Sequence, residues 1–369
     1  MTGSGRSAYL FLSLLQARVG SSLISRLGEL PPEGILKVSS RDIAGQMKMT
    51  DRAARSFDSL KSDFDPDALL QRLSERGIET LTPADEDYPG RLTEMPDPPP
   101  ALFVDGDIPR GPTVAVVGSR KASPTGLGVA RNLGRMLAER GVCVVSGLAL
   151  GVDAAAHQGA LDAGGPTVGV LGCGIDVVYP RSNRRLFGGV RESGAIISEY
   201  YLGEAPLAWR FPARNRIIAG LGDVLVVVEA AEKSGALITA RHALDSGRDV
   251  WAVPGPPGVA ECRGSNKLLA DGAGVLWDLA EFVDALSPAP VRSGYSQEGL
   301  GFETSIPEEL PANEAQALAG VGFEATPVDL AAEHSGLPMR ELLSALTLLE
   351  LKGYVSRDAA GAFLRRSAG

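Results

Sequence analysis

Apolar residues in the middle of the chain form short continuous runs, each followed by the spacing of an amphipathic helix. The segment DVLVVVE at 223–229 is typical, because five consecutive apolar residues indicate a strand buried on both faces. Such runs predict strands at 113–117, 142–146, 167–171, 195–199, 223–228 and 249–253. Helical spacing predicts helices at 126–140, 152–163, 182–188, 214–221 and 235–246. This alternation predicts an α/β fold with a doubly wound, mostly parallel sheet and helices on both faces.

The first 80 or so residues show helical periodicity only. The apolar run at 8–15 is similar to a signal-peptide core, but the pattern recurs at Leu23, Ile24 and Leu27, which favours a buried first helix. The segment as a whole is similar to a helix-hairpin-helix or SAM-like module, and a bundle that serves packing alone fits it about as well. No apolar run approaches the roughly 20 residues that span a bilayer.

The last part of the chain has a winged-helix pattern. Helices are expected at 328–334 and 338–352, and a two-stranded wing at 354–355 and 362–364. The preceding segment is rich in Pro, Gly, Ser and Glu, which is typical of a flexible linker. The predicted domains are a helical domain at 1–82, the α/β domain at 83–285 with a candidate strand at 101–104, a linker at 286–313 and the winged helix at 314–369.

The net charge of −9 argues against a nucleic-acid partner only at first sight. Residues 111–285 contain 17 Lys and Arg residues and 17 Asp and Glu residues, so the acidic excess lies entirely in the flanking segments. A neutral domain can still present a basic patch, because the local potential depends on where the charges lie. The three cysteines are far apart in the sequence and form no C-x-x-C motif, which suits a reducing cytoplasm and predicts neither a disulfide framework nor a zinc ribbon.

Small polar turns follow several predicted strands, at the edge where parallel sheets bind ligands. After the first strand, Gly118 lets backbone amides approach an anion, Ser119 offers a hydroxyl, and Arg120 and Lys121 offer cations. Further Gly-containing turns occur at 146–149, 172–174 and 229–235. We expect these turns to form a groove that follows a chain of phosphates, with Gly147, Lys233 and Ser234 among its lining residues.

The segment FPARNR at 211–216 places Phe211, Arg214, Asn215 and Arg216 just before a wholly apolar strand. Arginines near a core need an anionic partner or access to water. They could line the groove, or they could pair with Glu199 and Glu229 in a purely structural arrangement. Aromatic rings beside arginines suit unpaired nucleic acid. We expect Phe211 to stack on bases and Trp209 to lie in the core.

Other candidate sites are weaker. The chain contains neither G-x-G-x-x-G nor a Walker motif, which disfavours a dinucleotide or ATP enzyme. Asp153 and His157 share a helix face, but a helix-start carboxylate with a packed histidine is the commoner arrangement. Cys173 lies between glycines, where a small residue is usually needed for its size, so we do not expect it to be a nucleophile. The spacing of the three histidines predicts no metal site. We expect no cofactor and no catalytic residue.

A series of motifs in the α/β region resembles the DNA processing protein A (DprA/Smf) family. The resemblance covers roughly 83–285, and the helical and winged-helix flanks match the layout of that family. Its motifs, in order, are VVGSR at 116–120, SGLALGVDAAAH at 146–157, VLGCGID at 170–176, YPRSN at 179–183, FPARNRIIAGL at 211–221, KSGALITAR at 233–241 and GRDVWAVPG at 247–255.

The resemblance implies an extended Rossmann-like domain that binds single-stranded DNA without nucleotide chemistry. It also implies a cytoplasmic recombination mediator, dimeric through this domain, that protects incoming strands and loads RecA recombinase during natural transformation or DNA repair. At the positions that match the family's motifs, phosphates would be held by Gly118, Ser119 and Arg120. The residues of FPARNR would line the same groove. The alternative is a nucleotide phosphoribohydrolase of the LOG type, but that family has P-G-G-x-G-T-x-x-E where this chain has EKSGALIT at 232–239.

Overall fold

The computed structural model describes residues 3–20, 24, 27, 30–286, 310–321, 326–352, 354–357 and 363–365. The chain forms two compact units, Met1–Pro290 and Val291–Gly369. Nearly all of the predicted linker lies outside the described residues, so its flexibility stays a prediction. Within the described residues, no helix combines the length and apolar character needed to cross a bilayer.

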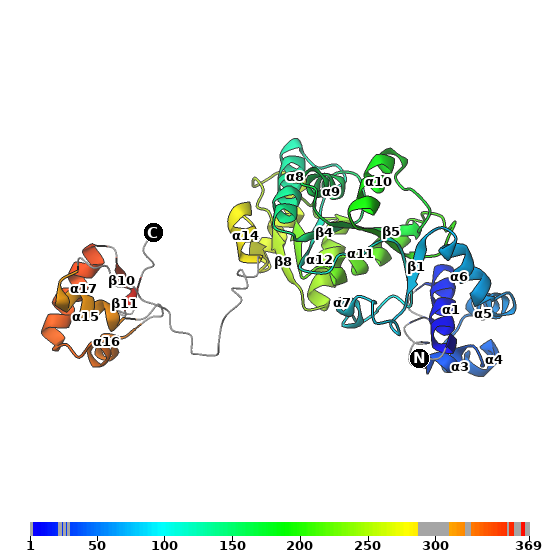
Figure 1. Ribbon diagram of the computed structural model, residues 1–369, viewed down its shortest axis with the longest axis horizontal. Coiled ribbons are helices and arrows are strands. Elements are labelled where there is room, and N and C mark those ends of the chain that lie inside the picture. The colour runs from blue at the N-terminus through cyan, green and yellow to red at the C-terminus, as the bar shows by residue number, and fades with distance from the viewer. Residues whose placement is uncertain are drawn as a thin grey trace. The chain divides into compact units, whose positions relative to one another are not determined.

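A nine-stranded sheet forms the centre of the larger unit, in the order β1-β2-β6-β5-β4-β3-β7-β8-β9 (Figure 1). The strands β3 to β9 run parallel, whereas β1 and β2 add two antiparallel strands beside β6. All six strands predicted from apolar runs are present. The strands are β1 (Ile78–Leu81), β2 (Leu102–Gly106), β3 (Thr113–Val117), β4 (Cys143–Ser146), β5 (Thr167–Gly174), β6 (Ala195–Tyr200), β7 (Val224–Val227), β8 (Asp249–Ala252) and β9 (Gly274–Val275).

Helices cover both faces of this sheet, as the pattern predicts. One face packs against α8 (Pro124–Glu139), α9 (Val152–Asp162), α10 (Arg184–Ser193) and α14 (Leu279–Leu286). The other face packs against α7 (Gly90–Thr93), α11 (Arg210–Leu221), α12 (Gly235–Asp245) and α13 (Arg263–Ala270). Alternate residues of each central strand enter the two cores, since Val114 and Val116 face α8 and α9 while Ala115 and Val117 face α11 and α12.

The strand order reverses at β3, and this reversal positions the site. From β3 the chain builds β4, β5 and β6 on one side, and it then returns to add β7 and β8 on the other. The loops that leave β3 and β7 therefore diverge above and below the sheet at their carboxyl ends. Such a switch point opens a crevice in doubly wound folds.

The N-terminal segment is helical, and its first helix is buried as predicted. It comprises α1 (Gly3–Val19), α3 (Pro32–Ile35), α4 (Ser40–Ile43), α5 (Asp51–Ser62) and α6 (Pro66–Ser74). The helices α1, α3, α4 and α5 share a core in which the rings of Phe11 and Phe57 meet edge to face, 5.1 Å apart, whereas α6 packs with α1 against the sheet. The relation to a SAM or helix-hairpin-helix module stays a prediction. The strand β1, within the segment predicted to be purely helical, instead joins the large sheet, because four residues are too few to reveal a period-2 pattern.

A buried ion pair joins α11 to the sheet and to α1. Arg216 donates from Nη1 to Glu199 Oε1 at 3.0 Å and from Nη2 to Oε2 at 2.8 Å, and its Nε lies 3.3 Å from Asp97 Oδ2. Glu199 also accepts a hydrogen bond from the Nε2 of Gln16 on α1, and Ser13 Oγ donates to the Glu199 carbonyl at 3.0 Å. The carboxylate next to it raises the pKa of Arg216 and keeps the guanidinium charged despite complete burial.

The smaller unit contains α15 (Ala312–Ala319), α16 (Val328–Ser335), α17 (Met339–Leu351) and an antiparallel pair of strands, β10 (Val355–Arg357) and β11 (Phe363–Arg365). The predicted helices and wing are confirmed. The helix α15 begins within the predicted linker and packs against α17. Gly336 ends α16 with a φ of +67°, a backbone conformation that favours glycine.

We expect the substitution Glu199→Ala to destabilise the larger unit by about 3–5 kcal/mol, because it leaves the Arg216 guanidinium buried without its bidentate partner. Urea unfolding followed by circular dichroism measures this loss. Asp162→Asn is the matched control, since it removes an exposed carboxylate paired with Arg131 and should change stability little. Equal midpoints for the two variants would contradict a structural role of the buried pair.

Candidate nucleic-acid interface

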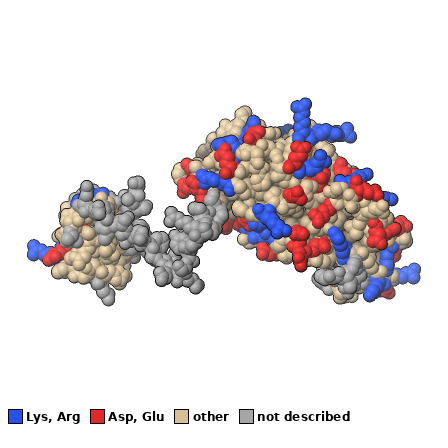
Figure 2. Space-filling model, in the orientation of Figure 1, with Lys and Arg blue, Asp and Glu red and all other residues tan. Residues whose placement is uncertain are grey.

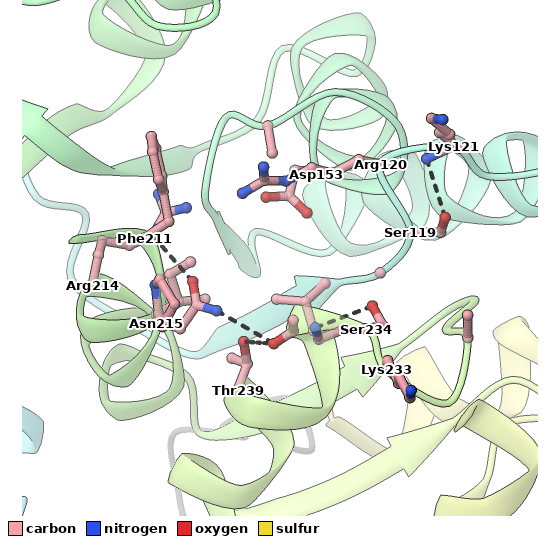
Figure 3. Close-up of a pocket in the computed structure, with 18 of the residues that line it drawn as sticks. Ser119, Arg120, Lys121, Asp153, Phe211, Arg214, Asn215, Lys233, Ser234 and Thr239 are labelled. Atoms are coloured by element: carbon pink, nitrogen blue, oxygen red, sulfur yellow. Dashed lines mark hydrogen bonds between the residues drawn. The ribbon is translucent and has the colours of Figure 1, made fainter. Parts of the chain in front are cut away.

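A cavity of about 730 Å³ opens at the carboxyl ends of β3 and β7, where the strand order reverses (Figure 3). Its walls come mainly from the loop after β3, the first turns of α11 and the loop that leads from β7 into α12, and the segments that follow β4, β5 and β6 complete them. The lining residues include Gly118, Ser119, Arg120, Lys121, Asp153, Tyr179, Phe211, Arg214, Asn215, Lys233 and Ser234. Nine of the residues predicted for the groove therefore come together in one cavity, and Gly147 and Arg216 do not line it.

Close packing against α9 holds the loop after β3 in place. The amide of Ser119 donates to the Glu229 carbonyl at 2.6 Å, and the Ser119 carbonyl accepts from the amide of Val152 at 3.1 Å. Gly151 makes this contact possible, because its φ is +82° and a Cβ there would lie 2.2 Å from the Ser119 carbonyl oxygen. The loop is thus a rigid support for the exposed side chains of Arg120 and Lys121.

The turn after β4 is strained and forms part of the same wall. Leu148 has a φ of +54°, in the left-handed region that a branched side chain rarely adopts. Burial of its side chain and a 3.0 Å hydrogen bond from Asn183 Nδ2 to its carbonyl stabilise this conformation. This left-handed conformation turns the chain sharply, so that Ala149 reaches the cavity.

Two aromatic rings and a guanidinium form a stack on one wall. The ring centroids of Phe211 and Tyr179 lie 5.4 Å apart with an interplanar angle of 35°, and the guanidinium carbon of Arg120 lies 5.4 Å from the Phe211 centroid. Gly172 lies beneath the Phe211 ring, because a Cβ there would approach the ring to 3.0 Å. Tyr179 is 43% exposed, which is high for a ring of this size. Sequence reasoning missed it, although the segment YPRSN was the signal that could have identified it.

Arg214 lies at the back of the cavity and points inward. Its Nη1 donates to the Gly147 carbonyl at 2.9 Å and to the Val170 carbonyl, and its Nε lies 3.3 Å from Asn215 Oδ1. Burial, and to a lesser degree the charge of Arg120, lowers the pKa of Arg214 to about 10, so it stays charged at neutral pH. Arg214 therefore affects the cavity mainly through its positive charge, and less through direct contact with a ligand.

The expected positions of Gly147 and Arg216 need correction. Gly147 leaves room for the Arg214 side chain, because a Cβ at this position would lie 2.6 Å from Arg214 Nη2. Arg216 is fully engaged by Glu199 and Asp97 on the far side of α11. The structural alternative is therefore confirmed for Arg216 and Glu199. It is wrong for Glu229, whose carboxylate accepts from the amide and hydroxyl of Ser123 at the start of α8 and pairs with no described arginine.

Three exposed cations surround the cavity mouth (Figure 3). Arg120, Lys121 and Lys233 form no ion pair with any described carboxylate, whereas many other arginines of this unit are paired. Positive and negative side chains are mixed on the face shown in Figure 2. The unpaired cations at one mouth therefore produce a local positive potential on a neutral domain.

The remaining candidates have structural roles. Asp153 accepts from the amide of Gly147 at 3.1 Å, burial raises its pKa, and the nearby Arg214 partly offsets that effect. His157 is fully buried with Nδ1 2.7 Å from Thr167 Oγ1, and burial lowers its pKa to about 3. Burial raises the pKa of Cys173 to about 11, so its thiol is a poor nucleophile. The described residues contain no cluster of three or more His, Cys, Asp or Glu suited to a metal ion.

Two further expectations are wrong. The segment 172–174 is not a turn, because β5 continues through Gly174. Trp209 is not a core residue, since it is 45% exposed.

Comparison with known proteins places these features in a family. Residues 79–287 match the family described as DNA recombination-mediator protein A, and residues 303–361 match the DprA winged helix domain. Protein Smf of Escherichia coli (strain K12) is 41% identical over 292 residues, which cover 76% of this chain and 76% of that protein.

Two solved structures are similar to this chain. The X-ray structure of DNA processing protein A from Streptococcus pneumoniae has a TM-score of 0.64 at 35% identity and covers 75% of this chain and 97% of that one. The structure of DNA processing protein A from Helicobacter pylori, described as giving insights into its single-stranded DNA binding mode, has a TM-score of 0.52 at 32% identity and covers 57% and 95%. The first family match spans more than half of the chain and includes every residue of the cavity. The chain therefore belongs to the DNA recombination-mediator protein A (DprA/Smf) family.

Proposed function

We propose that this chain binds single-stranded DNA in the cavity and acts as a non-catalytic recombination mediator. One observation carries the proposal: exposed rings and unpaired cations face the same open cavity. A strand could lay its phosphates along Arg120, Lys121 and Lys233 while a base stacks on Tyr179 or Phe211. The single-stranded DNA named for the relative from Helicobacter pylori supports this ligand class.

The stacked rings favour a single strand over a duplex. A base can reach Phe211, which is half-buried in the cavity wall, only when it is not paired and stacked within a helix. The side chains of Asn215 and Ser234 add donors that do not depend on base identity. Binding should therefore depend on salt and only weakly on sequence.

A mediator must also pass its bound strand to a recombinase. We propose that the chain works in the cytoplasm as a homodimer through the α/β domain, and that it delivers the bound strand to RecA recombinase. Membership of the recombination-mediator family supports this role.

Hydrolysis of a nucleotide by this cavity is not favoured. Asp153 is the one carboxylate among the described lining residues. It is buried, it accepts a hydrogen bond from the amide of Gly147, and it lies near the charges of Arg214 and Arg120. A general base needs a carboxylate that can reach the substrate. Chromatography of nucleoside monophosphates incubated with the protein should show no release of base, and substantial release would favour the LOG-type alternative.

We expect the double substitution Arg120→Glu and Lys233→Glu to weaken binding of a dT oligomer by about a hundredfold, because like charges would face the phosphates. The slope of log K against log salt should also become shallower by about 1.4, or about 0.7 per lost phosphate contact. Fluorescence anisotropy at several salt concentrations measures both quantities. Arg110→Glu is the matched control, since Arg110 is exposed and precedes β3 at the opposite end of that strand. Wild-type affinity in the folded double variant would refute the site.

Substitution Phe211→Ala should cost about 1–3 kcal/mol of binding, or roughly 5- to 150-fold in Kd, because a stacking platform is lost. Phe211→Tyr should retain most of the affinity, since the ring is kept. The same anisotropy titration compares the two variants, and their unfolding midpoints show whether the packing on Gly172 survives. Equal affinities of the Ala and Tyr variants would mean that no base stacks on this ring.

Delivery to RecA has its own test. On a single strand coated with single-strand-binding protein, we expect the wild-type chain to shorten the lag before RecA begins to hydrolyse ATP. The variant Arg120→Glu with Lys233→Glu should leave the lag unchanged, because it cannot hold the strand. If the wild-type chain binds the strand but never shortens the lag, the mediator role is wrong while the binding site stands.

A further inference from the structure

A second cavity, of about 280 Å³, lies between α11 and the N-terminal helices. Its lining includes Arg18 at the end of α1, Thr50 and Arg52 at the start of α5, and Trp209 just before α11. We infer that this cavity is a second subsite for the same single strand, with Trp209 as a base-stacking platform and Arg18 and Arg52 as phosphate contacts. The inference rests on the proposed function of the first cavity.

Trp209 is the feature that most needs an explanation. Large aromatic residues are highly buried on average, yet this ring is 45% exposed. The guanidinium of Arg210 lies over it, 5.3 Å from the ring centroid, and Tyr200 meets it edge-on at 6.5 Å. These contacts fix the ring and cover one part of it, and the remainder faces the cavity and solvent. A rigid, half-exposed ring backed by a guanidinium is suited to stacking with a base.

The cations beside Trp209 are free to bind an anion. Arg18 and Arg52 are exposed, and neither pairs with a described carboxylate. Asp51 precedes Arg52 in the sequence but does not line the cavity. The hydroxyl of Thr50 accepts from the amide of Ala53 at 3.2 Å and caps α5, and it carries no charge. Among the described lining residues, the two guanidiniums are therefore the charged groups that a phosphate would meet.

Buried hydrogen bonds fix the N-terminal helices relative to Trp209. The Nη2 of Arg210 donates to the Ala17 carbonyl at 3.1 Å, directly before Arg18. Earlier in α1, Ser13 and Gln16 donate to Glu199, the residue that also binds Arg216. Figure 1 shows α1 and α5 side by side at this end of the unit. Arg18, Arg52 and Trp209 thus form one preorganised surface although they come from segments far apart in the sequence.

The two cavities share a wall, which points to one continuous ligand. Pro206 and Ala208 line the first cavity, and Trp209, the next residue, lines the second. Both sides of this wall present an exposed aromatic ring with unpaired cations. A ligand with regularly repeated phosphates and bases fits this repetition, whereas a mononucleotide would fill only one of the two. The segment 206–209 would then be the crossing point of the strand.

The test compares dT oligomers of about 6 and about 20 nucleotides, one near the lower end and one beyond the upper end of the site sizes of single-strand binding folds. The variant Arg18→Glu with Arg52→Glu changes only exposed side chains and should fold normally. We expect it to bind the short oligomer as the wild type does and the long oligomer about tenfold more weakly, with a salt slope shallower by about 1.4. The matched control is Arg55→Glu, an exposed arginine on α5 that lines neither cavity.

Trp209→Ala should also weaken binding of the long oligomer about fivefold or more, and Trp209→Phe should retain most of it. Wild-type binding of the long oligomer by both the double arginine variant and Trp209→Ala would overturn the second subsite. An equal loss of affinity in the Arg55→Glu control would overturn it too, because the loss would then reflect the added negative charge and not the second cavity. If instead the wild type binds neither oligomer, or binds both independently of Arg120 and Lys233, the proposed function of the first cavity fails.

Discussion

The ion pair between Arg216 and Glu199 is the constraint on which the rest of the larger unit depends. Both charged groups are buried, and neither would be stable there alone. Together they fix the rotation of α11 about its axis and the distance of that helix from β6. Through Gln16 and Ser13 the same carboxylate residue also anchors α1, so the N-terminal helices and the sheet share one polar junction.

Fixing the rotation of α11 decides what faces the cavity. Phe211, Arg214 and Asn215 are at positions i, i+3 and i+4 of one helix and therefore share a face, whereas Arg216 points away from it. Arg214 is held inward by two carbonyls, which leaves the ring of Phe211 and the amide of Asn215 as the surface of this wall. The structural residue Arg216 and the groove residues thus lie on two different faces of α11.

The cavity combines immobile and free charges. Arg214 and Asp153 are buried, while Arg120, Lys121 and Lys233 remain exposed and unpaired among the described residues. The buried charges cannot move to follow a ligand, and the exposed ones can adapt to phosphates at different spacings. Such a division suits a ligand that is recognised by its backbone and not by its sequence.

The sequence by itself determined the parallel sheet, most of its strands, though not β1 and β9, and the loop at 118–121. Buried parallel strands are continuous apolar runs, and phosphate-binding turns need small residues. It also indicated Phe211, Arg214, Asn215, Lys233 and Ser234. Only the tertiary structure decided the roles of Arg216, Gly147, Tyr179 and Trp209. The prediction started α11 at residue 214 and not at Arg210, so Phe211 lay outside the predicted helix, and the helical period could not place Phe211 on the face of Arg214 and away from Arg216. Tyr179 and Trp209 owe their exposure to contacts between segments far apart in the chain, and periodicity reports only on neighbours along it.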